Sequence, residues 1–439
     1  MEEAQSWEPG AVAITAAAKR AHAHLIRLAR SGDETRIMAE GRDSKEQSEF
    51  REHCRRWLAE NRPPAPSFRM PIAPIEVATE EQRRYLCAWQ KKCHTAGLVG
   101  TDYPKAYGGH GHKGFQSVAT QEMARANVPF MINVIGLGMA APTILVHGTE
   151  EQKTRYLPPL LAADEIWCQG FSEPGAGSDL AGVQASAVRQ GDHWIVNGHK
   201  VWTSLAHFAS WMIMLCRSSR EHKYNGLTYF IVPIAGAKGV TVRPLVKMTG
   251  EVGFNEVLFE DVVVPDSLRL DEVGKGWTVA MTTLTYERGA AEGAGSGGGP
   301  SVEEQIQALV DLAKRTRRNG GTAWDDAVVR DRIVQLAVRA EGLRQNARRM
   351  RVQSLVDHPM RIPLQGKVLI TELIQDMAAI GVEIAGAHAS RYLGDPGAPD
   401  GGHWPHAYMN SYGMTIAAGS NEIQRNILGE RVLGLPKSK

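Results

Sequence analysis

The hydrophobic pattern of the chain changes its period twice. From residue 46 to about 165, apolar residues recur at helical spacing. From 166 to 275 they alternate with polar residues in short segments, and from 276 to 439 the helical spacing returns. We therefore predict an α+β protein with an N-terminal α-helical domain (46–165), a middle β domain (166–275) and a C-terminal helical bundle (276–439), preceded by an extension at 1–45.

The middle region contains several short apolar runs of the length that strands take. The segments predicted as strands are 211–216, 227–233, 240–245 and 255–265. Asn197-Gly198 stands between two further alternating segments, and this dipeptide is a strong short-range indication of a β-hairpin turn. No long helical segment separates the strands, so we expect an antiparallel barrel or sandwich. A Rossmann sheet would need crossover helices.

Composition narrows the class of protein without identifying it. The 439 residues are 22% charged and 43% hydrophobic with a net charge of +2, values that give no reason to expect a nucleic-acid partner. No apolar stretch approaches the roughly 20 residues that a membrane span needs. The five cysteines are scattered without a C-x-x-C pair, which favours a reducing compartment over disulfides or a zinc site. His110 and His112 lie in a glycine loop without acidic partners, so no metal site is predicted.

The N-terminal extension raises the question of targeting. Glu2-Glu3 argues against a signal peptide, but residues 11–31 contain four basic residues and no acidic one, which is faintly similar to a transit helix. We favour an amphipathic or partly disordered extension and a cytoplasmic location; a transit segment would place the protein in the mitochondrial matrix. A glycine-rich stretch at 293–299 is expected to be a flexible linker.

A second glycine-rich stretch, GFSEPGAGSDL at 170–180, follows an apolar run and invites a functional interpretation. Glycines allow backbone N–H groups to approach an anion closely. A P-loop is excluded because Gly177 is followed by Ser178 and not by lysine. A dinucleotide-binding fingerprint is excluded because Leu180 stands where the third glycine belongs. The role of this loop must therefore come from its neighbours.

Four segments, taken together and in order, carry a resemblance to a known family. They are CQGFSEPGAGSD at 168–179, NGHKVWTS at 197–204, YER at 286–288 and GSNEIQRNILGERVLGLP near the C-terminus. The chain resembles the acyl-CoA dehydrogenase family over about residues 46–436, and the combination is highly specific although each segment alone is weak. The resemblance implies FAD as cofactor, an acyl-CoA substrate, an electron-transfer flavoprotein as acceptor, and a homodimer or homotetramer.

In this family the glycine-rich loop lies over the flavin and the thioester end of the acyl-CoA. The residues that the resemblance implies for cofactor binding are Gln169, Phe171, Ser172, Trp202, Ser204, Ser420 and Glu422. Those implied for substrate binding are Ser178, Thr285, Arg288 and Ala418. An aromatic side chain such as Trp202 suits a flavin site because it excludes water and covers a large flat ring; alone, it would be interpreted as a barrel-core tryptophan.

The family reaction, α,β-dehydrogenation, needs a base for the α-proton and hydrogen bonds to the thioester carbonyl. Many members carry the base as a glutamate before Gly-Ser on the C-terminal loop, where this chain has Ala418. Other members carry it on the helix after the β domain, one residue before an arginine, and there this chain has Glu287. We predict Glu287 as the base, with Ala418 donating only its backbone N–H. The alternative is that Glu287 merely pairs with a neighbouring helix.

Two departures from the family pattern concern the grip on FAD. The usual Arg-x-x-Phe, which reaches the FAD of a neighbouring subunit, is matched by Gly321–Trp324, so the arginine is lost. The usual Gln-x-x-Gly-Gly has no clean counterpart, although residues 383–387 stand nearby. Arg330 and Arg332, close to Trp324 in the sequence, are candidates to compensate.

These departures leave three alternatives beside a homo-oligomeric dehydrogenase. The chain could be one subunit of a hetero-oligomer that shares FAD sites with a paralogue. It could be a flavin oxidase or monooxygenase on the same scaffold. It could also be a non-catalytic relative that has lost flavin, although Glu287 and the KVWTS segment weigh against this last option.

Overall fold

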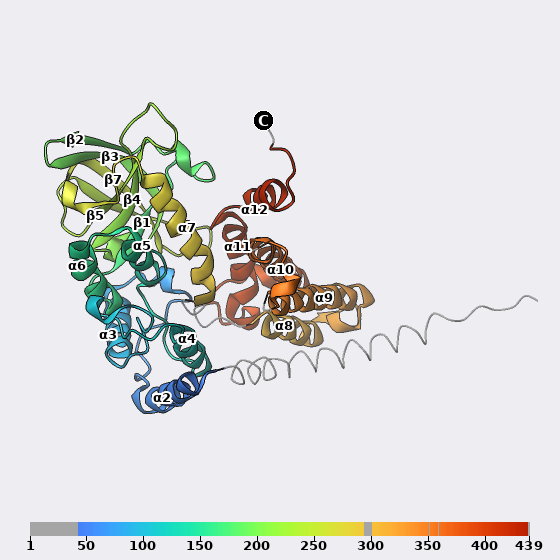
Figure 1. Cartoon of the computed structure of the whole chain (residues 1–439). Helices are drawn as coiled ribbons and strands as arrows, with labels where there is room; N and C mark the ends of the chain where they lie inside the picture. Colours follow the sequence, from blue (N-terminus) through green and yellow to red (C-terminus); the bar gives the residue numbers. More distant parts are fainter. Residues whose placement is uncertain (1–42, 294–300, 351, 359, 438–439) are drawn as a thin grey trace, which may run out of the picture. The chain divides into compact units, whose positions relative to one another are not determined.

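The computed structural model describes residues 43–437 except 294–300, 351 and 359 (Figure 1). The predictions for the N-terminal extension, with its candidate transit segment, and for the 293–299 linker therefore lie outside the described residues, apart from the extension's last three residues and Gly293. The described chain divides into two compact units, which are residues 44–293 and 301–437. They are called the N-terminal unit and the C-terminal unit below.

The N-terminal unit contains six α-helices. They are α2 (Lys45–Asn61), α3 (Glu80–Thr95), α4 (Gln116–Arg125), α5 (Ala141–His147), α6 (Glu150–Leu161) and α7 (Gly276–Gly293). Ser44, Thr79 and Thr149 each form a capping box at the start of a helix, in which the hydroxyl accepts a backbone N–H and a glutamine side chain returns the bond. Each cap contributes about 1 kcal/mol to its helix, so local sequence fixes these starting points.

Eight strands between α6 and α7 form one sheet. They are β1 (Trp167–Gly170), β2 (Ser186–Gln190), β3 (His193–Ser204), β4 (Trp211–Arg217), β5 (Leu227–Pro233), β6 (Val240–Leu245), β7 (Phe254–Pro265) and β8 (Arg269–Leu270). Their order is β6-β7-β3-β2-β4-β5-β8, with β1 beside β4. The pairs are antiparallel except for β1 with β4 and a single bridge between β2 and β4. The mainly antiparallel middle region is confirmed.

The predicted hairpin turn at Asn197-Gly198 is wrong, because both residues lie inside the single long strand β3. The Asn197 amide donates to Asp261 Oδ1 at 2.9 Å and accepts from the Asp261 backbone N–H at 2.8 Å, which creates a bulge in the pairing of β3 with β7. A Cβ at Gly198 would lie 2.4 Å from the Cβ of Ala185. Asn197 therefore stabilises a bulge, and Gly198 allows β3 to approach Ala185 closely.

The turn of this hairpin lies six residues earlier. Gln190 pairs with His193, so Gly191 and Asp192 form a two-residue loop between β2 and β3. Gly191 has a φ of +64°, which favours glycine at the first turn position.

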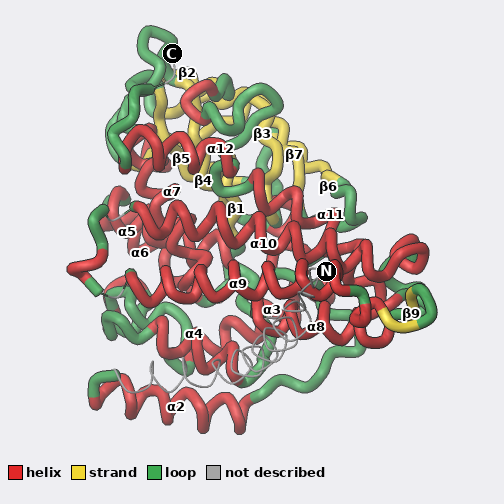
Figure 2. The backbone as a smooth tube through the Cα atoms, turned by 90° about the vertical axis from the view of Figure 1, so that its right-hand side faces the viewer, coloured by secondary structure: helices red, strands yellow, loops and turns green. Residues whose placement is uncertain are grey.

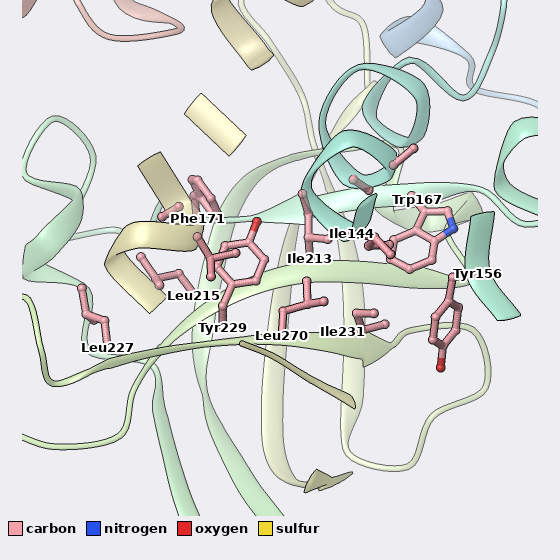
Figure 3. Close-up of a cluster of buried hydrophobic side chains, with 14 of the residues drawn as sticks. Ile144, Tyr156, Trp167, Phe171, Ile213, Leu215, Leu227, Tyr229, Ile231 and Leu270 are labelled. Carbon is pink, nitrogen blue, oxygen red and sulfur yellow. The ribbon is translucent and has the colours of Figure 1, made fainter. Parts of the chain in front are cut away.

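The central strands β4 and β5 are buried on both faces. Tyr229, Ile213 and Leu215 face a cluster that also includes residues of α5, α6 and α7 (Figure 3). Met214 and Phe230, on the opposite face, pack into a second cluster with residues of β3 and β7. Burial on both faces explains why the sequence shows continuous apolar runs here instead of alternation.

The C-terminal unit is helical apart from a short strand pair (Figure 2). Its α-helices are α8 (Val302–Arg315), α9 (Ala327–Arg349), α10 (Arg361–Ala385), α11 (His403–Ile416) and α12 (Asn421–Ile427), and β9 (Arg317–Arg318) pairs with β10 (Gly321–Thr322). A Cβ at Gly381 of α10 would lie 2.1 Å from the ring of Trp404, so this glycine lets α11 pack closely. Trp404 is buried in the core formed by α8, α9 and α10.

Candidate active site

A bulge in β3 presents Trp202 to the outside. The pairing of β3 with β7 shifts register between Lys200 and Thr203. Trp202 has a φ of +58°, its side chain is 58% exposed, and its ring meets Phe254 edge-on at 5.7 Å. A tryptophan in the left-handed region is strained, and such strain concentrates at functional sites. Trp202 is thus not a barrel-core residue, and its flat apolar ring is available to cover a ligand.

The glycine-rich loop begins where β1 ends, at Gly170. A Cβ there would lie 2.2 Å from Met212 Sδ, so any larger residue at this position would require the buried Met212 side chain to move. At the crest, a Cβ on Gly175 or Gly177 would have no heavy atom of the described residues within 4 Å, apart from its chain neighbours. The neighbouring Ser178 is exposed. The crest of the loop therefore faces open space that a ligand can approach.

The start of the loop carries groups that fit a polar ring system. The Gln169 Nε2 amide is buried and has no hydrogen-bond partner among the described residues. Such a donor is costly to leave unpaired and fits an acceptor supplied by a cofactor. Phe171, two residues further along the chain, is buried, and Ser172 is half-buried, as is Ser204 at the end of β3. These residues fit the flavin that the resemblance implies.

Helix α7 carries the predicted base close to the residues of this loop. The Thr283 hydroxyl lies 2.9 Å from the Tyr229 hydroxyl and 2.9 Å from that of Thr143, and all three side chains are buried. Tyr229 also meets the ring of Phe171 edge-on at 5.8 Å. Glu287 follows Thr283 by one helical turn and is half-buried. Burial raises the pKa of Tyr229 above its ordinary value, and the charge of Glu287 adds to the effect.

Two residues expected to hold the CoA portion flank the base on α7. Thr285 is exposed, and its hydroxyl donates to the Met281 carbonyl of its own helix at 2.8 Å. Arg288 follows Glu287 directly. Their contact with CoA stays a prediction.

The remaining predicted residues belong to the C-terminal unit. Ala418 has a φ of +54° in the loop before α12, and its carbonyl accepts from Gln424 Nε2 at 2.9 Å. Ser420 caps α12 by accepting the Ile423 backbone N–H at 3.4 Å. Glu422 is exposed in the first turn, where a backbone N–H and the Ser420 hydroxyl hold its pKa below the ordinary value. Ser420 and Glu422 thus already stabilise a helix start.

The two arginines suggested to compensate for the lost family arginine are both engaged within the C-terminal unit. Arg330 Nη1 donates to the Trp324 carbonyl at 2.7 Å. Arg332 forms an ion pair with Glu383. Their role at FAD remains a prediction.

Sequence reasoning missed three buried residues that organise this region. Glu173 and Lys200 form a buried ion pair at 2.7 Å, and Tyr229 joins the loop to α7. Glu173 and Lys200 lie inside the two quoted segments GFSEPGAGSD and NGHKVWTS, so their opposite charges within the segments that carry the resemblance were the available indication. Tyr229 carried no such indication.

Within the described residues, no helix is both long and apolar enough to span a bilayer. No cluster of three or more metal-ligating side chains occurs in this part of the chain either.

Three family models match the chain in consecutive order. They describe the N-terminal domain (44–164), the middle domain (168–262) and the C-terminal domain (274–433) of acyl-CoA dehydrogenase. Matches along most of the chain define an FAD-dependent oxidoreductase that acts on acyl-CoA. The chain belongs to the acyl-CoA dehydrogenase family, and the alternative of a relative without flavin or catalysis is set aside.

Individual relatives agree with the family models. The chain is 37% identical over 399 residues to acyl-CoA dehydrogenase IpdE1 of Mycobacterium tuberculosis, covering 89% of this chain and 98% of that protein. Among solved structures, it is similar to the Tcur3481-Tcur3483 steroid ACAD, with a TM-score of 0.73, 28% identity, and coverage of 90% of this chain and 99% of that chain. The ChsE4-ChsE5 complex from Mycobacterium tuberculosis matches with a TM-score of 0.69, 28% identity and the same coverage.

Proposed function

We propose that the protein oxidises an acyl-CoA thioester to the 2-enoyl-CoA, with Glu287 as the base that removes the α-proton. The observation that supports this most is the chain of contacts from Phe171 through Tyr229 to Thr283, one helical turn before Glu287. It links the helix of the base to the loop expected to contact the flavin. The family position for an alternative base, residue 418, is an alanine and cannot accept a proton.

The residues of the N-terminal unit would hold FAD by complementary means. Trp202 covers a flat ring and excludes water, while Gln169 supplies a buried donor and Ser172 and Ser204 supply hydroxyls. When bound, FAD accepts the hydride that leaves the β-carbon of the substrate. The Ala418 backbone N–H is proposed to hydrogen-bond the thioester carbonyl and so to stabilise the negative charge that develops there.

The experiment that tests this function is the visible spectrum of the purified protein under anaerobic conditions, before and after addition of acyl-CoAs. A flavin band that bleaches on addition supports both FAD use and acyl-CoA oxidation. A band that persists with every acyl-CoA tested, including the steroid type considered next, would contradict the proposed reaction. Oxygen consumption during turnover in air distinguishes the oxidase or monooxygenase alternative, which would consume oxygen stoichiometrically with substrate.

The substrate and the assembly can be proposed one level finer. One similar structure is named a steroid ACAD, which favours a polycyclic acyl group here, so the acyl-CoA panel should compare steroid and straight-chain thioesters. Two of the similar structures are named as pairs of proteins, and this chain lacks the family arginine at Gly321. We therefore propose a hetero-oligomer with a paralogous subunit over a homo-oligomer, to be tested by co-expression with paralogues and by mass measurement of the purified complex.

The acceptor and the location follow the family and the relatives. We propose an electron-transfer flavoprotein as the acceptor, tested by its reduction in a coupled assay. We also propose a cytoplasmic location, since the relative with 37% identity is bacterial. The mitochondrial alternative has no such support.

A further inference from the structure

A fully buried lysine joins the two segments that face the expected flavin site. Lys200, on β3, has no exposed side-chain surface. Its Nζ donates to Glu173 Oε1 at 2.7 Å, to the Leu215 carbonyl at 2.9 Å and to the Phe171 carbonyl at 3.1 Å. All three hydrogens of the ammonium group are thereby used. Burial lowers the pKa of Lys200 below its ordinary value, and the charge of Glu173 opposes that effect.

Glu173 extends this junction to the far end of the loop. Its carboxylate also accepts the backbone N–H of Gln184 at 2.7 Å and of Ala185 at 2.9 Å. The loop is further closed on itself, because Glu173 and Ala176 exchange backbone hydrogen bonds at 2.8 and 3.1 Å. The pair therefore fixes the start of the glycine-rich loop, its exit before β2, and strands β3 and β4 at a single point.

The surfaces expected to contact flavin lie directly beside this point. The Ser172 carbonyl accepts the Val201 backbone N–H at 2.9 Å. Ser172 directly precedes Glu173 in the chain, and Val201 directly follows Lys200. The bulge that turns Trp202 outward begins at Lys200. Phe171, whose carbonyl is bound by Lys200, carries the ring that meets Tyr229. One buried pair thus contacts both the segment that forms the loop side of the site and the strand that carries Trp202.

Stability alone does not explain why a charge pair is buried here. Desolvation of two charges is expensive, and replacing a buried pair by well-packed neutral groups is often neutral or stabilising. A network in which every polar group is paired instead imposes one geometry on the segments that it joins. We infer that Lys200 and Glu173 are positioning residues that preform the flavin-binding surface, an inference that rests on the proposed use of FAD at this loop.

A second buried ion pair, whose glutamate also accepts from Arg55 Nε at 2.9 Å, provides a control on other elements. Arg51 Nη1 donates to Glu122 Oε1 at 2.8 Å and joins α2 to α4, on elements that carry none of the residues expected to contact flavin. Both side chains are buried. A purely structural role for Lys200 and Glu173 predicts that loss of either pair has the same effect on FAD binding.

The test compares the double variants Lys200→Met/Glu173→Gln and Arg51→Met/Glu122→Gln in the full chain. FAD is removed and titrated back while flavin fluorescence and the visible spectrum are recorded, and Tm is measured without flavin. We expect the Lys200/Glu173 variant to raise the FAD Kd at least tenfold, which corresponds to about 1.4 kcal/mol, with weaker quenching of flavin fluorescence. The control variant should change Tm by about as much as the Lys200/Glu173 variant does, while its FAD Kd stays within about twofold of that of the unmodified protein.

The outcomes distinguish failure of the positioning role from failure of the proposed FAD-dependent function. An FAD Kd within about twofold of the unmodified protein in the Lys200/Glu173 variant, or equal losses in both variants, would overturn the positioning role. Should the double variant fail to fold, Glu173→Gln alone keeps the lysine and its two carbonyl acceptors in place, and the inference then requires a rise of several-fold. A protein that binds no FAD either alone or when co-purified with a paralogous subunit would overturn the proposed function and this inference together.

Discussion

Replacing Glu287 with glutamine is the most direct test of the assignment of the base. The amide has nearly the same size and shape as the carboxylate, and the residue is half-buried on α7, so the packing of the helix on the sheet is retained. Thr283 and Tyr229 keep their hydrogen bond, because neither depends on the charge at 287. The variant should therefore fold, bind FAD and retain a Tm close to that of the unmodified protein.

The kinetic effect is expected to be large. A positioned general base contributes about 10²- to 10⁴-fold, which corresponds to about 3–5.5 kcal/mol of transition-state stabilisation at 1.36 kcal/mol per tenfold. The N-terminal unit offers the exposed Glu60 of α2 for a matched control, and Glu60→Gln should leave turnover unchanged. The assay is the anaerobic rate of flavin bleaching by acyl-CoA in single turnover, which reports the chemical step without product release.

A relocation of the base provides the complementary experiment. The double variant Glu287→Gln/Ala418→Glu places a carboxylate at the position that other family members use. Ala418 already adopts a φ of +54°, so the backbone strain of a glutamate there is similar to that of the alanine. We expect partial recovery of the bleaching rate. A Glu287→Gln variant that bleaches at the rate of the unmodified protein would refute the reasoning, whatever the double variant does.

Three further predictions test the site and the stability of the N-terminal unit. Trp202→Ala should weaken FAD binding and increase the fluorescence of bound flavin while leaving Tm nearly unchanged, since the ring is mostly exposed; unchanged fluorescence would contradict its role as a covering ring. Gly170→Ala should destabilise the protein by about 1–3 kcal/mol, because its Cβ would meet Met212 Sδ at 2.2 Å. Thermal unfolding measures this effect, and a Tm equal to that of the unmodified protein would be incompatible with this packing. Hydrogen bonds from Arg269 lower the pKa of Asp266 from 3.8 to about 2, so its contribution to the free energy of unfolding is present above pH 3.8 and is lost as pH falls toward 2. In urea titrations, Asp266→Asn should reduce stability at neutral pH and flatten this acid dependence, and parallel pH profiles would disprove the linkage.

The strands were predictable where burial dictated the sequence. Strands β4 and β5 are apolar apart from Arg217 and Thr228 because both of their faces are covered, and this burial leaves a clear pattern in the sequence. The wrong hairpin shows the opposite case. A turn dipeptide is a local preference, and the bonds between Asn197 and Asp261, 64 residues apart, override it in a way that no short window reveals.

The site was predictable only as far as its residues lie in recognisable segments. Trp202 and Glu287 could be named because the resemblance places them, while composition and periodicity alone identified neither. Tyr229 was missed because its importance comes from contacts with Phe171 and Thr283, which are distant in the sequence. The partners of Lys200 likewise come from separate stretches of chain, and only folding brings them together.

Helix α7 belongs to the N-terminal unit, and this affects how the distance between the proposed base and the flavin loop is controlled. The family model assigns this helix to the C-terminal domain, whereas its contacts group it with the sheet. Glu287 therefore belongs to the same compact body as Phe171 and Trp202, and a base at residue 418 would belong to the other. With the base at 287, the distance from base to flavin loop is built into one hydrophobic core and is insensitive to changes in domain docking.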